Sequence, residues 1–125
     1  MGRTLVRNYK DLRVWEEAHR LTLAIYAVTN GFPRDERFGL TSQVRRASAS
    51  IAANLAEGCG RRSDGEMARF VQIAMGSGAE FSYHLLLARD LGFLKGEEYA
   101  NLIAAVDRVM RMLSALSGKV RNIPA

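Results

Sequence analysis

The sequence predicts an all-α protein that folds as an antiparallel, up-down-up-down four-helix bundle, with residues 1–125 forming one domain. Two observations favour this class. Apolar residues recur at every third or fourth position along most of the chain, and no segment alternates as a half-buried strand does. The segments that interrupt this pattern are short, so successive helices are expected to lie side by side and antiparallel.

The first predicted helix spans residues 11–30. Asp11 can cap its N-terminus, Gly31 can end it, and Pro33 prevents its continuation. The second predicted helix, 38–58, has two different faces. Its apolar face consists of Leu40, Val44, Ala47, Ile51 and Leu55. Its polar face consists of Arg46, Ser50, Asn54 and Glu57.

The third predicted helix spans residues 64–91 and the fourth spans residues 97–119. Ser63 and Glu66 match a capping box at the start of the third helix, and Gly92 can end it. Apolar residues of the fourth helix are spaced alternately three and four positions apart, which aligns them along one seam. These residues are Tyr99, Leu102, Val106, Val109, Leu113, Leu116 and Val120.

The composition of the third helix also indicates that the protein self-associates. Between Arg69 and Arg89 its only charged residue is Glu80. A helix that is apolar nearly all round is buried on more than one side, whereas a four-helix monomer buries one side of each helix. We therefore expect a homo-oligomer, in which the small residues 76–79 let another helix approach closely. The alternative, a loop that covers this helix within the monomer, needs a longer connection than the sequence predicts.

The polar face of the second helix is interpreted as a hydrogen-bonded joint that fixes how the helices meet, because buried polar groups need partners. Ser77 and Glu80 of the third helix are expected to belong to it, and Arg46 is expected to meet Glu57 or Glu80. The predicted joint comprises Arg46, Ser50, Asn54, Glu57, Ser77 and Glu80.

Three residues of the third helix, Ser77, Glu80 and His84, contain the groups of a hydrolytic triad. Side chains on one straight helix do not usually align as a relay, and no oxyanion loop accompanies them. Cys59 is interpreted as a small residue at a helix end rather than a reactive thiol. It shares no metal-ligand spacing with His19 or His84. We therefore expect no catalytic residue, no metal site and no cofactor. We also expect that the protein is not an enzyme.

A single cysteine excludes a disulfide within the chain, and the N-terminus lacks an apolar segment of signal-peptide length. A cytoplasmic protein is therefore expected. The most apolar segment, residues 70–88, contains Gln72, Glu80 and His84, which argues against a membrane span.

The basic residues predict a nucleic-acid partner. The chain has 18 basic and 13 acidic residues, a net charge of +5, and all its basic residues except Lys10, Lys95 and Lys119 are arginine. Arginine matches phosphate with a planar, two-pronged set of donors, so RNA or DNA is expected. A GC-rich genome also enriches arginine, and arginines also pair with carboxylates. The candidate contacts are Arg13, Arg20, Arg45, Arg61, Arg62 and Arg69. Few aromatic residues flank them, so stacking on single-stranded bases is not expected.

The chain resembles the four-helix-bundle family named for proteins encoded in 23S rRNA intervening sequences. The resemblance rests on Tyr9-Lys-Asp-Leu-x-Val-Trp15, Leu40-Thr-Ser-Gln-x-Arg-Arg-Ala, Ser50-Ile-Ala-Ala-Asn-Leu-Ala-Glu-Gly58 and Ala74-Met-Gly-Ser-x-Ala-Glu80. It implies a ring-like homopentamer without enzymatic activity. The family is also similar to the accessory variability proteins of diversity-generating retroelements, which are basic and associate with nucleic acid and a reverse transcriptase.

Together these observations predict a non-enzymatic, oligomeric protein that binds structured RNA or a nucleoprotein through an arginine-rich surface. A pentamer would carry a charge of about +25, which attracts polyanions in a salt-dependent way. The alternative is a protein-interaction scaffold, for example one that holds a reverse transcriptase, with only incidental contact to nucleic acid.

Overall fold

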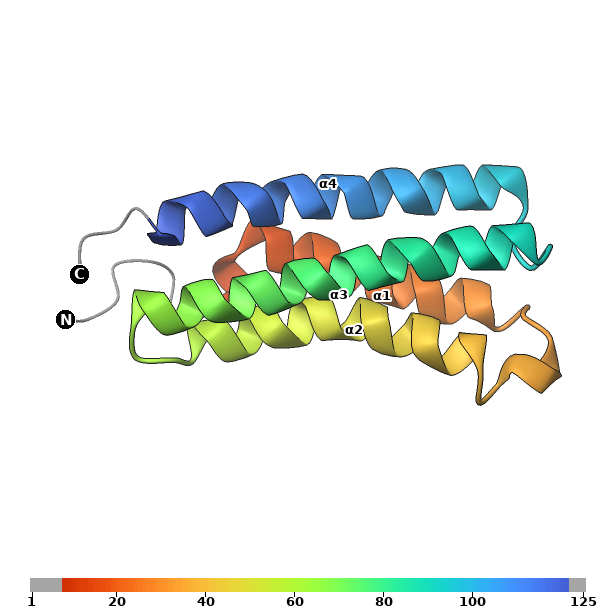
Figure 1. Ribbon diagram of the computed structural model, residues 1–125, viewed down its shortest axis with the longest axis horizontal. Coiled ribbons are helices and arrows are strands. Elements are labelled where there is room, and N and C mark those ends of the chain that lie inside the picture. The colour runs from red at the N-terminus through yellow and green to blue at the C-terminus, as the bar shows by residue number, and fades with distance from the viewer. Residues whose placement is uncertain (1–7, 122–125) are drawn as a thin grey trace.

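The computed structural model describes residues 8–121 as four helices without a strand (Figure 1). The helices are α1 (Arg13–Thr29), α2 (Leu40–Cys59), α3 (Asp64–Asp90) and α4 (Gly96–Arg121). Two short 3-10 helices, η1 (Tyr9–Asp11) and η2 (Arg34–Glu36), precede α1 and α2. The predicted all-α class is confirmed.

Each helix packs against two others, in the order α1, α2, α3, α4 and back to α1. The contact between α2 and α3 is the most extensive, and the contact between α1 and α4 is the smallest. Successive helices run in opposite directions, so the α1–α2 and α3–α4 connections lie at one end of the bundle and the α2–α3 turn lies at the other (Figure 1). These two ends carry different arginines.

The apolar faces predicted from the sequence form the core. All five apolar residues of the α2 face are buried. On α4, every residue of the predicted seam is buried except Tyr99, which is partly buried against the core. Phe81 of α3 and Ile25 of α1 are completely enclosed. A helical apolar period is therefore sufficient to place these side chains.

The start of α1 differs from the prediction. The helix begins at Arg13 after the N-cap Leu12, which provides no side-chain cap, and Asp11 belongs to η1. The reason is an earlier cap: the Asn8 side chain accepts a hydrogen bond from the Lys10 backbone N–H at 3.0 Å, which begins a 3-10 turn ahead of α1.

The ends of α3 follow the predicted signals. Ser63 Oγ accepts a hydrogen bond from the Glu66 backbone N–H at 3.1 Å, and it donates to the Glu66 carboxylate at 3.3 Å. At the other end, Gly92 has a φ of 83°, which favours glycine. The Phe93 N–H reaches the Ala88 carbonyl at 2.8 Å and the Gly92 N–H reaches the Arg89 carbonyl at 2.9 Å, forming a Schellman motif.

The small residues of α3 have a role within the monomer. A Cβ on Gly78 would collide with the Met110 sulfur of α4, so this glycine allows α3 and α4 to pack closely. Gly76 faces open space. The outer surface of α3 still exposes Ile73 and Tyr83. Along residues 8–121, every helix is too short or too polar to cross a bilayer.

Candidate nucleic-acid interface

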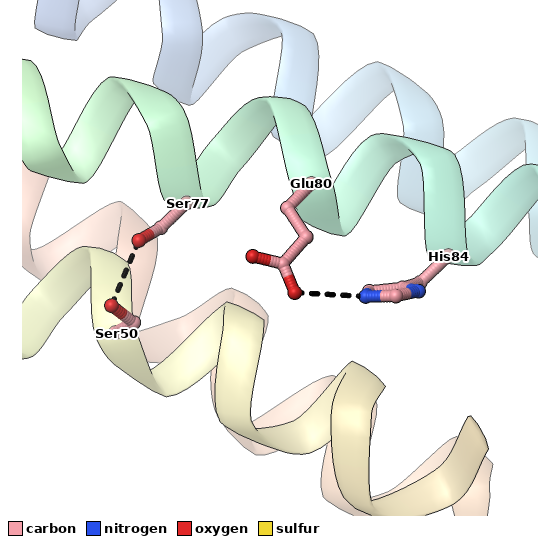
Figure 2. A network of polar contacts seen from close by, with 4 residues as sticks. All are labelled: Ser50, Ser77, Glu80 and His84. Carbon is pink, nitrogen blue, oxygen red and sulfur yellow. Dashed lines mark hydrogen bonds and ion pairs between the residues drawn. The ribbon is translucent and has the colours of Figure 1, made fainter. Parts of the chain in front are cut away.

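The polar face of α2 joins α3 at its centre. Ser50 Oγ and Ser77 Oγ lie 2.8 Å apart (Figure 2). The Asn54 amide donates to the Ser50 carbonyl at 2.8 Å and to Ser50 Oγ at 2.9 Å. All three side chains are half-buried. The structure thus brings together three of the six residues of the predicted joint.

The outer members of the polar face have other partners. Arg46 is exposed and donates to Ser42 Oγ at 3.4 Å, while Glu57 pairs with Arg61 at 2.6 Å. Arg46 and Glu57 are separated by eleven residues of one helix, about 16 Å of rise, so they cannot meet directly. The carboxylate of Glu80 lies 3.1 Å from His84 Nε2 instead of pairing with Arg46 (Figure 2).

The geometry of α3 separates the groups of the imagined triad. Ser77 is hydrogen-bonded to Ser50, whereas His84 bonds Glu80 (Figure 2). His84 is 7% exposed, and its Nδ1 has no hydrogen-bond partner among the described residues. Cys59 is buried. Along residues 8–121, no three His, Cys, Asp or Glu side chains gather as metal ligands would.

Arg45 is the most firmly held of the candidate arginines. Its Nε donates to Thr29 Oγ1 at 2.8 Å, and its Nη2 donates to Asn30 Oδ1 at 3.2 Å and to the Tyr26 carbonyl at 3.4 Å. The guanidinium also lies 4.7 Å from the centre of the Tyr26 ring. All these partners are neutral, so Arg45 is fixed in place without a carboxylate partner within residues 8–121.

The other candidate arginines lie elsewhere. Arg61 pairs with Glu57 and lies 4.8 Å from the Phe70 ring centre. Arg62 and Arg69 are exposed near the same α2–α3 turn. Arg13 is exposed at the start of α1, and Arg20 pairs with Glu16 at 3.4 Å on α1. The structure does not gather the six predicted arginines into one surface.

The structure instead adds neighbours to Arg45 that the sequence analysis missed. Two adjoining hollows beside the α1–α2 connection share Arg37, Thr41 and Arg45 in their linings. We call their combined polar and aromatic lining the basic hollow. It includes Tyr26, Arg34, Arg37, Phe38, Thr41, Arg45 and Arg46, together with Thr29, Asn30, Phe32, Ser42 and Ser50. No carboxylate lines either hollow or pairs with these four arginines within residues 8–121.

A signal for this surface was present in the sequence. The connection between the first two helices reads Phe-Pro-Arg-Asp-Glu-Arg-Phe over residues 32–38. Phe32 turns into the core, whereas Phe38 is 91% exposed, and the Arg37 guanidinium lies 5.8 Å from its ring centre. An aromatic residue beside arginines in a helix connection could have been recognised as a candidate contact.

The fold and this surface define a class: an all-α, four-helix bundle with an arginine-lined hollow at one end. The family model for the 23S rRNA-intervening sequence protein matches residues 10–115, and the chain belongs to this family. The expected family resemblance is confirmed.

A solved structure shares the fold. It is a protein of unknown function from the S23 ribosomal protein family of Bacteroides thetaiotaomicron, with a TM-score of 0.77 and 19% sequence identity. The alignment covers 84% of this chain and 95% of that one. No curated protein matches the sequence.

Proposed function

We propose that this protein binds RNA through the basic hollow and acts by binding rather than by catalysis. The observation that carries the proposal is the state of Arg45, which neutral partners hold in place without cancelling its charge. Arg34, Arg37 and Arg46 surround it and are also free of carboxylate partners within residues 8–121. Such an arrangement attracts phosphate and orients a planar donor toward it. The family name, which refers to an intervening sequence of 23S rRNA, points to the same partner.

We further propose that the protein works as a homo-oligomer, with the pentameric ring as the preferred state. Leu23 of α1 and Ile73 and Tyr83 of α3 are exposed at 57%, 40% and 58%. Removing such side chains from water against another copy of the chain would be favourable. Light scattering on the purified protein is expected to give a multiple of 13.9 kDa, near five protomers for the ring. A monomer at micromolar concentration would contradict the assembly.

RNA binding is tested with matched arginine pairs at the two ends of the bundle. We expect R37Q/R46Q, in the basic hollow, to weaken binding of a structured RNA hairpin and to lower the slope of affinity against salt. R61Q/R62Q removes the same charge at the α2–α3 turn. It is expected to weaken RNA binding less, because Arg61 already forms an ion pair with Glu57. R108Q/R111Q on α4 is the control. Equal losses from all three pairs would show only a general charge effect and would contradict the proposed site.

The same exposed apolar residues favour a second candidate function. A protein-interaction scaffold, for example one that holds a reverse transcriptase, would use exposed apolar residues as contacts, Leu23 on α1 or Ile73 and Tyr83 on α3. It would bind RNA or DNA weakly and without dependence on the basic hollow. Absence of RNA binding at low salt, with the oligomer intact, would favour this scaffold over the proposed function.

A further inference from the structure

We propose that the basic hollow recognises an unpaired nucleotide, with its base stacked on Phe38 and the adjoining phosphates held by arginines. This inference rests on the proposed RNA binding and names the class of RNA: a single-stranded, looped or bulged segment rather than a continuous duplex.

Phe38 presents its aromatic ring to solvent. Its side chain is 91% exposed, which makes it the most exposed large apolar side chain among those described. Arg37 lies on one side of its ring at 5.8 Å, and the ring borders the hollow that contains Arg45 and Arg46. An exposed aromatic ring among arginines is the arrangement that proteins use to stack an unpaired base while binding its backbone.

Arg45 supplies hydrogen-bond donors in the hollow that this ring borders. The Arg45 side chain uses its Nε and Nη2 groups for Thr29, Asn30 and Tyr26. Its Nη1 group has no hydrogen bond within residues 8–121, so two N–H donors remain for a ligand. Because the guanidinium is already fixed, a phosphate that binds it orders little additional side chain.

A further, independent observation is an unused hydroxyl. Thr41 lines both parts of the basic hollow and is only 7% exposed. Its Oγ1 is buried without a hydrogen-bond partner among the described residues, and buried polar groups are rarely left unpaired. Rotation of the Thr41 side chain would bring this hydroxyl to a ribose or base edge in the hollow. The hollow therefore offers charge, a stacking ring and an unsatisfied polar group.

A duplex cannot use these features together. Bases in an A-form helix are stacked on one another, and the major groove is too narrow for side chains to reach them. Phe38 can contact a base face only where the strand is unpaired. Contacts with phosphates alone would leave Phe38 and Thr41 without a ligand.

The test compares a 5′-labelled single-stranded oligouridine with an RNA duplex of the same length. For F38A we expect affinity for oligouridine to fall on the order of tenfold, with affinity for the duplex within about twofold of wild type. F38W is expected to retain single-strand binding, with its fluorescence quenched by the oligouridine beyond any change in the wild type, which contains only Trp15. L91A, which removes an exposed apolar side chain at the end of α3, is the control.

The outcomes separate this inference from the proposed function. If neither RNA binds at low salt, both fail. If both RNAs bind with a steep salt dependence but F38A behaves as wild type, the protein binds RNA and the unpaired-nucleotide inference is wrong. If F38A lowers the mass measured by light scattering, Phe38 is a contact between subunits and the inference is also wrong.

Discussion

The two ends of the bundle both carry arginines that the sequence marked as candidates, yet the structure treats these arginines differently. At the α1–α2 end, Arg45 is held by a hydroxyl, an amide, a carbonyl and an aromatic ring. At the α2–α3 end, Arg61 is held by the Glu57 carboxylate at 2.6 Å. One arrangement fixes a cation and preserves its charge, whereas the other cancels the charge locally.

From this comparison we expect the partners of an arginine to matter more for polyanion binding than the number of arginines. Arg45-Arg46 and Arg61-Arg62 are equivalent as sequence motifs. The first pair lies beside Arg34 and Arg37 and has no carboxylate partner within residues 8–121, whereas Arg61 of the second pair is paired with Glu57. The predictions below test whether this difference in partners controls stability and binding.

The largest effect is expected from R45Q. The substitution removes charged hydrogen bonds to Thr29 and Asn30 and the contact with the Tyr26 ring. Hydrogen bonds from charged groups contribute about 1.5–3 kcal/mol, so the free energy of unfolding should fall by about 2 kcal/mol in urea denaturation. R46Q on the exposed neighbouring position is the control and should change it by less than about 0.5 kcal/mol. Equal effects would mean that Arg45 does not clamp α1 to α2.

The next largest effect is expected from adding a carboxylate beside Arg46, at the α1–α2 end of the bundle. Ser42 already accepts a hydrogen bond from Arg46 at 3.4 Å, so S42E should pair with Arg46 one turn away. We expect RNA affinity to fall about fivefold at low salt and the salt slope to decrease. Position 42 lies in the first turn of α2, where an acid is favourable, so stability should not decrease. S42Q is the uncharged control. Unchanged affinity in S42E would contradict a role for Arg46.

A smaller effect is expected from breaking the ion pair at the other end. The Arg61 and Glu57 side chains are 41% and 52% exposed, so solvent and salt screen their attraction. R61Q should lower the free energy of unfolding by about 0.5 kcal/mol, and the loss should disappear in high salt. A double-mutant cycle with E57Q measures the coupling directly. A coupling above about 2 kcal/mol would show that this end is as firmly fixed as the Arg45 end.

The smallest effect is expected from removing the carboxylate beside Arg61. E57Q removes one negative charge from the α2–α3 end and should raise RNA affinity about twofold. E16Q, which releases Arg20 on α1, is the control for the change in net charge. A drop in affinity for E57Q would show that Glu57 positions Arg61 for contact with RNA rather than offsetting its charge.

Much of the fold could be predicted because it depends on local signals. The apolar seam of α4, the capping box at Ser63 and the glycine stop at Gly92 are each determined by residues within a few positions of one another. The prediction that Asp11 caps α1 was wrong for an equally local reason, because a competing cap at Asn8 lies three residues earlier.

The candidate surface was harder to predict because it depends on pairings between helices. Periodicity places Arg46 and Glu57 on one face. It does not reveal that Arg46 hydrogen-bonds Ser42 or that Glu57 pairs with Arg61. Arg45 meets residues 15 to 19 positions away, on α1 and just beyond it. Phe38 was missed because sequence composition does not distinguish it from Phe32, which is buried.

The close approach of α3 and α4 at Gly78 limits how this protein can evolve. A methyl group at 78 would meet the flexible end of Met110, which can rotate away, whereas a branched side chain would push α4 outward. Enlargement beyond a methyl group at position 78 is therefore expected to require a smaller side chain at position 110. Substitutions at positions 78 and 110 are therefore expected to occur together. The side chain at one position is expected to become smaller before the side chain at the other becomes larger.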